Sequence, residues 1–125
     1  MAAMVCCRPQ PPVEQVATPA LGSVRRVSVT GARAWEKVVW LDARAAEEFE
    51  ADHVPGALPL RESHWESDFP GVLDAWQPDS KVVIYCGQRC DASEDAARRL
   101  VRDTEWTEVF VLEGGWEAWK QAVAN

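Results

Sequence analysis

The sequence VVIYCGQRCDASEDAARRL occupies residues 82–100 of the chain. Residues 82–85 are β-branched or aromatic, which predicts a strand buried within a sheet. Cys86 ends this strand, a short polar loop follows over residues 87–91, and the remainder has the spacing of an amphipathic helix. We therefore predict a strand, a loop and a helix in succession, with the cysteine at the carboxyl end of the strand.

Cys86 is the candidate nucleophile. The positive end of a helix dipole and the free backbone N–H groups of its first turn stabilise an anion, which for a cysteine is the reactive thiolate. A cysteine in such a place can equally be a small buried hydrophobe that closes a strand. Parallel sheets bind ligands at the carboxyl ends of their strands, and this favours the reactive interpretation.

The composition is that of one folded domain. The chain has 125 residues, 47% of them hydrophobic, with seven tryptophans, which suffices for a single core. A formal charge of −7 argues against a nucleic-acid partner, because phosphate contacts need a basic face. The four cysteines are too few and too unevenly spaced for a secreted disulfide scaffold.

Residues 1–22 are Pro-rich and predict a flexible tail ahead of a domain at residues 23–125. The tail has no basic region and only a short apolar run, so we expect neither a signal peptide nor a membrane span, and a cytoplasmic location. One alternative is that this run is the end of a membrane anchor lying further upstream. Cys6 and Cys7 lack a second pair of ligands nearby and are interpreted as incidental thiols.

The remaining apolar stretches alternate between strand and helix patterns. Strands are predicted over residues 24–29, 38–41, 57–58, 82–85 and 109–112. Helices are predicted over residues 30–35, capped by Thr30, over residues 45–51 with Phe49 inward, over residues 92–101, and after residues 114–115. This alternation implies an α/β fold with parallel strands and helices on both faces of the sheet.

Residues 62–76 carry an aromatic and aliphatic stripe. Trp65, Phe69, Leu73 and Trp76 are spaced four, four and three apart, which is typical of one face of a helix. Pro70 and Gly71 are expected to break that helix into two pieces. We interpret the stripe as core packing.

Several motifs follow one another in a characteristic order. They are LDAR at residues 41–44, a short helix, HVPGA at residues 53–57, VVIYC at residues 82–86 before its loop and helix, and VLEGGWEAW at residues 111–119. In this order, over residues 24–122, the chain resembles a rhodanese-like domain. The resemblance implies a central parallel sheet of about five strands flanked by helices on both faces. It also implies a sulfurtransferase that carries a sulfane sulfur as a persulfide on Cys86, while Asp42, Arg44 and His53 shape the surrounding loops.

The loop departs from the common single-domain pattern C-x-x-G-x-R-S. Ser93 comes seven residues after Cys86, one later than in that pattern, and Arg89 stands where the pattern has glycine. Asp91 occupies the position of the pattern's arginine, and Cys90 is additional. Phosphatases of the same fold need an arginine six residues after the cysteine to grip phosphate, where this chain has alanine, so we discount that activity.

The whole loop is the predicted substrate-binding segment: Gly87, Gln88, Arg89, Cys90, Asp91 and Ala92. Arg89 is expected to hold an anionic donor, with an exposed rim arginine as the alternative. Asp91 or Ser93 is expected to cap the following helix, Asp91 together with Glu94 in a capping-box spacing. The negative charge of Asp91 disfavours dianionic thiosulfate and favours a persulfide donor.

Cys90 opens a second class of function. Its spacing from Cys86 allows a disulfide within the loop, so Cys90 is a candidate resolving thiol in a redox or sulfide-releasing cycle; a core position for its side chain is the alternative. A third class is a non-catalytic interaction module. A zinc site could be counted from Cys86, Cys90, His53 and His64, but the two histidines lack the paired spacing of zinc ligands. No metal or cofactor is therefore expected. The expected partners of this monomer are small sulfur donors and thiol acceptors, or a persulfide carrier protein.

Overall fold

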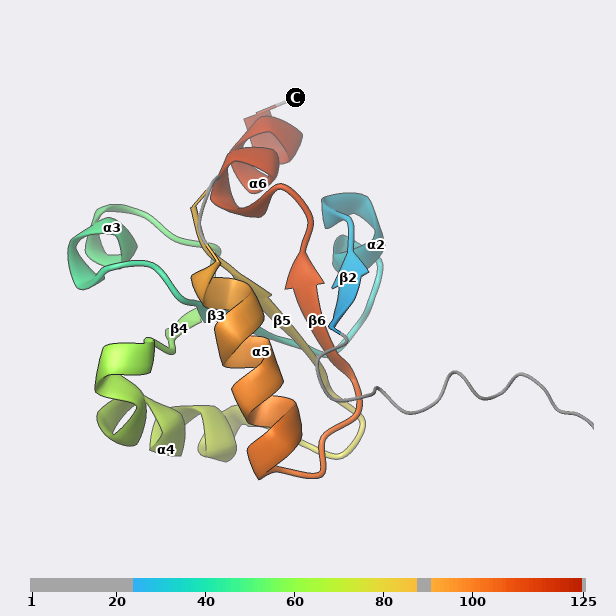
Figure 1. Ribbon diagram of the computed structural model, residues 1–125. Helices are drawn as coiled ribbons and strands as arrows, with labels where there is room; N and C mark the ends of the chain where they lie inside the picture. The colour runs from blue at the N-terminus through green and yellow to red at the C-terminus, as the bar shows by residue number, and fades with distance from the viewer. Residues whose placement is uncertain (1–23, 88–90, 125) are drawn as a thin grey trace, which may run out of the picture.

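The computed structural model describes residues 24–87 and 91–124 (Figure 1). Five strands in these residues form one sheet in the order β2-β6-β5-β3-β4, and every neighbouring pair is parallel. The strands are β2 (Arg25–Val27), β3 (Val38–Asp42), β4 (Leu58–Pro59), β5 (Lys81–Tyr85) and β6 (Val109–Leu112). The α/β class and the parallel sheet of about five strands are confirmed.

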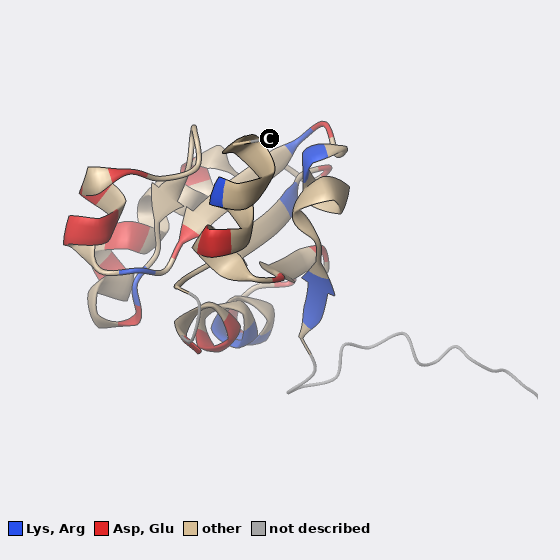
Figure 2. Ribbon diagram, turned by 90° about the horizontal axis from the view of Figure 1, so that it is seen from above, with Lys and Arg blue, Asp and Glu red and all other residues tan. Residues whose placement is uncertain are grey.

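Helices cover both faces of this sheet. They are α2 (Val29–Arg33), α3 (Ala46–Ala51), the short 3₁₀ helix η1 (Glu62–His64), α4 (Trp65–Ala75), α5 (Ala92–Asp103) and α6 (Gly115–Ala124). Helices α4 and α5 pack on one face, and α5 crosses in front of the strands in Figure 1. Side chains of α2, α3 and α6 pack on the other face, and Figure 2 shows the same arrangement from above.

Strand β5 lies at the centre of the sheet because both of its faces are apolar. Val82 and Ile84 point into the core beneath α4 and α5, whereas Val83 and Tyr85 point into the opposite core. The side chains of Val82, Val83, Ile84 and Tyr85 are all fully buried. A continuous apolar run is the pattern expected of a parallel strand covered on both faces.

The first described helix is capped by a different residue from the one predicted. Ser28, not Thr30, is the N-cap of α2, and its hydroxyl accepts a hydrogen bond from the Gly31 N–H at 3.0 Å. Ser28 has the extended backbone of an N-cap residue, while Thr30 already lies within the helix.

The predicted break in the aromatic helix is also wrong. Helix α4 is continuous and contains Pro70 in its interior. Trp65 and Val72 are buried on the core side, whereas Pro70 lies on the exposed side of the helix. Packing of the apolar stripe therefore outweighs the local cost of the proline. Leu73, a member of the predicted stripe, is 49% exposed, and Val72 takes its place in the core.

The turn between β6 and α6 brings two backbones into direct contact. Gly114 and Gly115 both have positive φ, at 77° and 58°. The N–H of Trp116 donates a hydrogen bond to the carbonyl oxygen of Cys86 at 2.9 Å, which ties the start of α6 to the end of β5. A Cβ on Gly115 would lie 2.3 Å from that same oxygen, so only glycine fits there.

We predict that Gly115→Ala lowers the free energy of unfolding by about 2–4 kcal/mol, because it adds left-handed strain and a backbone overlap. The matched control is Gly71→Ala in α4, where a Cβ meets nothing within 4 Å. It should raise the free energy of unfolding by about 0.5–1 kcal/mol. Urea unfolding followed by tryptophan fluorescence measures both variants. Equal changes in the free energy of unfolding would contradict the close contact between Gly115 and the Cys86 carbonyl oxygen.

Candidate functional site

A cavity of about 270 Å³ opens at the carboxyl ends of β5 and β6. Its described lining residues are Arg26, Cys86, Gly87, Asp91, Ser93, Glu94, Val111, Leu112, Gly114 and Gly115. Cys86 directly follows β5, is only 2% exposed, and packs in the core beneath α5. Its thiol lies 3.6 Å from the carbonyl oxygen of Gly87. The cysteine therefore borders the cavity while nearly all of its surface is covered by protein.

Two helix beginnings border this cavity. The first turn of α5 contributes Ser93 and Glu94, and the turn into α6 contributes Gly114 and Gly115. The amino ends of helices carry partial positive charge and unpaired N–H groups. The cavity is therefore suited to stabilise a thiolate or the anionic end of a bound molecule.

Asp91 stands at the N-cap position of α5, as the sequence predicts, but its side chain makes no capping hydrogen bond. Its backbone angles, φ −97° and ψ 2°, are not the extended ones that aim a capping side chain at the first turn. The predicted capping box with Glu94 is therefore wrong. Ser93, the alternative cap, lies inside the helix and is buried against the cavity.

The structure places some of the predicted site residues at the cavity and leaves others undescribed. Cys86, Gly87 and Asp91 line the cavity together, while Ala92 begins α5 beside them without lining it. Three loop residues, Gln88, Arg89 and Cys90, lie outside the described residues, and so does the tail at residues 1–22. Their predicted roles stay predictions.

Sequence reasoning missed Arg26 and Glu94. Arg26 comes from the edge strand β2, and its guanidinium forms an ion pair with the carboxylate of Glu94 on α5. Paired arginines at positions 25 and 26 were a signal, since they stand out in an acidic chain. Arg26 lines the same cavity as Cys86 only because β2 lies beside β6, which no local pattern shows.

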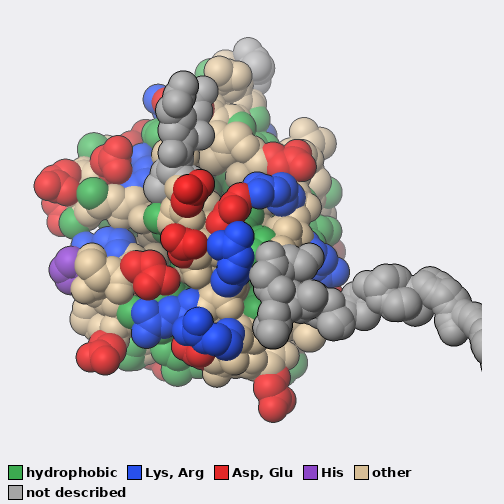
Figure 3. Space-filling view, viewed as in Figure 1, with side chains coloured by type: hydrophobic (Ala, Val, Ile, Leu, Met, Phe, Trp, Pro, Cys, Tyr) green, Lys and Arg blue, Asp and Glu red, His purple; other side chains and the backbone are tan. Residues whose placement is uncertain are grey.

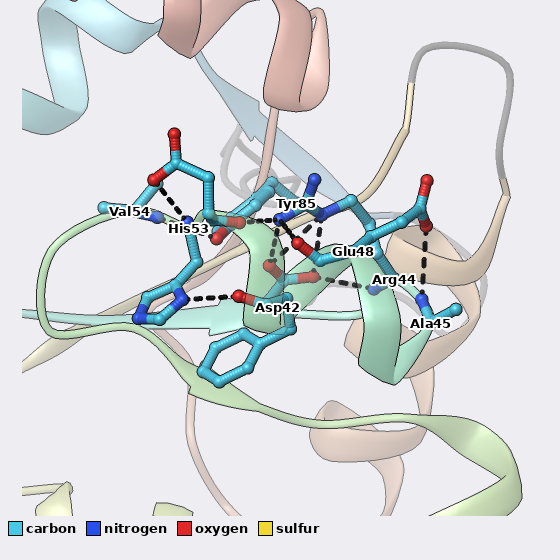
Figure 4. Close-up of polar contacts among 9 residues, drawn as sticks. Asp42, Arg44, Ala45, Glu48, His53, Val54 and Tyr85 are labelled. Atoms are coloured by element: carbon cyan, nitrogen blue, oxygen red, sulfur yellow. Dashed lines mark hydrogen bonds and ion pairs between the residues drawn. The ribbon is translucent and has the colours of Figure 1, made fainter.

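A buried ion pair between Asp42 and Arg44 lies at the end of β3 (Figure 4). The Asp42 carboxylate is fully buried and accepts three hydrogen bonds from the Arg44 guanidinium, at 2.8–3.2 Å, and one from the Arg44 N–H. Arg44 also donates to the carbonyl oxygens of Glu48 and Asp52, which bracket the end of α3.

Aromatic rings enclose the same arginine. The Arg44 guanidinium lies 4.4 Å from the ring centre of Trp116 and 5.6 Å from that of Tyr85. Burial lowers the pKa of Arg44, but hydrogen bonding and charge attraction to Asp42 raise it, and the net pKa lies above its ordinary value. Burial raises the pKa of Tyr85, whose hydroxyl accepts a hydrogen bond from the Val54 N–H. Both groups are therefore held in one protonation state.

His53 belongs to this cluster and is not among the residues that line the cavity. Its ring stacks on Phe49 at a centroid distance of 3.9 Å, and Nδ1 lies 2.7 Å from the Phe49 carbonyl oxygen. Because a carbonyl can only accept, Nδ1 carries the proton. The contacts of Asp42, Arg44 and His53 join α3 to the sheet and to α6.

Within residues 24–87 and 91–124, no three His, Cys, Asp or Glu side chains are grouped closely enough to hold a metal ion. His64, counted among the four zinc candidates, is instead within hydrogen-bond distance of the Ser63 hydroxyl through Nδ1. In the same described part of the chain, no helix combines the length and apolar character needed to cross a membrane.

The rhodanese-like domain family matches residues 29–122, and the chain belongs to that family. Over 82 residues it is 33% identical to the thiosulfate sulfurtransferase GlpE of Pseudomonas savastanoi pv. phaseolicola, covering 66% of this chain and 72% of that protein. The resemblance predicted from the motif order is thus confirmed. This likeness supports a sulfurtransferase-type enzyme, although rhodanese domains also occur in non-catalytic proteins.

Solved structures share the fold. The human single-domain sulfurtransferase TSTD1 superposes with a TM-score of 0.62 at 22% identity, covering 78% of this chain and 96% of that one. A Rhodopseudomonas palustris protein described as a possible tyrosine phosphatase superposes with a TM-score of 0.56 at 27% identity, covering 82% and 83% of the two chains.

We predict that Asp42→Asn lowers the free energy of unfolding by about 3–5 kcal/mol, because it leaves the buried Arg44 charge without its partner. Asp79→Asn is the matched control, since Asp79 forms an exposed ion pair with Lys37 and its loss should not measurably change stability. Urea unfolding at pH 7 measures both. A small effect of Asp42→Asn would contradict an anchoring role for the buried pair.

Proposed function

We propose that this protein is a sulfurtransferase that carries a sulfane sulfur as a persulfide on Cys86. The observation that carries the proposal is the placement of Cys86, which is nearly buried, at a cavity bordered by the beginnings of α5 and α6. Two helix amino ends border this cavity, and the positive end of a helix dipole favours an anion. The family and its thiosulfate sulfurtransferase relatives support the same reaction class.

In the first half-reaction the Cys86 thiolate attacks the outer sulfur of the donor. A new S–S bond forms to Cys86, the donor's own bond to that sulfur breaks, and the leaving group departs with the electron pair. From thiosulfate the leaving group is sulfite; from a small persulfide it is the parent thiolate. The terminal persulfide sulfur then lies where the helix amino ends stabilise negative charge.

In the second half-reaction an acceptor thiolate or cyanide attacks the terminal sulfur. The S–S bond to Cys86 breaks, its electron pair returns to Cys86 as thiolate, and the acceptor leaves as a persulfide or as thiocyanate. No external oxidant or reductant is consumed. The proposed partners are therefore small sulfur donors and thiol acceptors, or a protein that presents a persulfide.

The charges around the cavity favour a persulfide donor over thiosulfate. Asp91 and Glu94 both line it, and thiosulfate is a dianion. Coulomb repulsion in a partly desolvated cavity raises the cost of binding a dianion more than that of a donor whose charge lies away from the reacting sulfur. We therefore propose weak activity with thiosulfate.

A phosphatase activity is disfavoured by the residues of the loop. Six positions after Cys86, where bidentate phosphate binding needs arginine, the chain has Ala92 at the start of α5. The structural likeness to a possible tyrosine phosphatase therefore concerns the fold.

We predict that Cys86→Ser reduces sulfur transfer, from thiosulfate and from glutathione persulfide, to the uncatalysed rate, whereas Cys90→Ser retains transfer. Peptide mass spectrometry after donor loading should find one extra sulfur on Cys86 in wild type and none in Cys86→Ser. Circular dichroism of both variants controls for folding.

Two results would replace the proposed sulfurtransferase function with another one. Loss of activity in both variants, with a Cys86–Cys90 disulfide detected, would establish the redox or sulfide-releasing cycle instead. Wild type that takes no sulfur from any donor, with a Cys86 inert to alkylation, would indicate a non-catalytic interaction module.

A further inference from the structure

An ion pair between two elements far apart in sequence stands beside Cys86. Arg26 on β2 and Glu94 on α5 are both lining residues of the cavity, and their side chains are joined directly. The guanidinium side chain is 49% exposed and the carboxylate side chain 25% exposed. The pair therefore lies at the rim, where solvent and a ligand can both reach it.

The sheet register explains why Arg26 and not Arg25 faces the cavity. Arg26 is level with Val111, whose side chain lies in the core beneath α5. Arg25 is level with Phe110 on the opposite face, and its guanidinium lies 4.5 Å above the Phe110 ring. Because side chains alternate across a strand, the two neighbouring arginines reach opposite sides of the sheet.

Among the described lining residues, Arg26 is the single cation, and it shares the lining with two acidic residues, Asp91 and Glu94. Glu94 also lies 3.5 Å from the Arg98 guanidinium, so it is held between an arginine of β2 and one of its own helix. Figure 3 shows acidic and basic side chains interleaved over the face that carries α5. The positive charge of Arg26 at the cavity is thus already partnered by Glu94.

We propose that Arg26 binds the anionic group of the sulfur donor and that Glu94 competes for it, so that this pair sets which donor charge the site accepts. The inference rests on the proposed persulfide chemistry of Cys86 and adds its specificity-determining residues. A donor's sulfonate or carboxylate replaces the Glu94 carboxylate on the guanidinium, in the planar two-point geometry that arginine offers. A dianion gains most from Arg26 and is repelled most by Glu94 and Asp91.

A purely structural role for the pair makes a different prediction. If the ion pair only joined β2 to α5, its removal would change stability slightly and would act alike on every donor, because exposed pairs contribute little. Charge recognition instead produces an effect that grows with donor charge and shrinks as salt screens it.

The test measures formation of the Cys86 persulfide from two donors that differ by one charge. They are thiosulfate, a dianion that releases sulfite, and benzenethiosulfonate, a monoanion that releases benzenesulfinate. The variants are Glu94→Gln, which leaves Arg26 without this competitor, and Arg26→Gln. The control is Glu108→Gln, which removes the same charge from an ion pair with Arg25 that is outside the cavity lining.

Glu94→Gln should raise kcat/KM about tenfold for thiosulfate and about threefold for benzenethiosulfonate, mostly through KM, with both gains shrinking as salt is raised from 0.01 to 1 M. Arg26→Gln should lower kcat/KM for thiosulfate about tenfold and Arg26→Lys less, since lysine keeps the charge without the planar geometry. Glu108→Gln should match wild type.

A second measurement does not depend on turnover. Sulfate, an inert dianion, should protect Cys86 from alkylation by the neutral reagent iodoacetamide in wild type, more strongly in Glu94→Gln and not in Arg26→Gln.

Changes in kcat/KM that are equal for both donors, independent of salt, or shared by Glu108→Gln would overturn the inference. In that case Cys86 still takes up sulfur, so only the role of Arg26 and Glu94 fails. Wild type that takes sulfur from no donor defeats the proposed function itself and this inference with it.

Discussion

The close approach of Gly115 to the carbonyl oxygen of Cys86 is the constraint on which the site depends. The Trp116 N–H hydrogen-bonds to that oxygen, so the end of the central strand and the start of the last helix share one contact. No residue with a Cβ fits at Gly115 without moving one of these backbones. The contact holds the beginning of α6 at the cavity, on one side of the sheet. It also holds Trp116 over Arg44, on the other side.

Side chains alternate between the two faces of the sheet along β5. This alternation separates the proposed chemistry at Cys86 from the buried ion pair of Asp42 and Arg44. Tyr85 points to the face where Asp42, Arg44 and His53 join α3 to the sheet, while Cys86 packs beneath α5. The buried ion pair can therefore be fully satisfied without placing its charge in the cavity. A substitution on one side of the strand is expected to act through stability, and one on the other side through reactivity.

The cavity combines opposite electrostatic influences. Two helix amino ends favour an anion there, whereas Asp91 and Glu94 oppose one, and Arg26 is held by Glu94. In the proposed reaction, this balance favours a thiolate or persulfide, which carries a single negative charge, over a dianionic donor. The proposed choice of donor therefore rests on charges contributed by β2, by Asp91 and by α5.

Local pattern was enough to predict the α/β class and the position of Cys86 at a strand end, because alternating apolar runs and helical spacing report which faces are buried. The same reasoning failed at Pro70, where tertiary packing of Trp65 and Val72 kept the helix whole, and at Asp91, whose backbone does not aim its side chain as a cap. Arg26 reaches the cavity only because β2 pairs with β6 in a register that faces it toward α5. The sequence thus determines which segments form strands and helices and where the cysteine stands. The tertiary structure decides which charges surround the cysteine, since pairing between distant strands leaves no periodic trace along the chain.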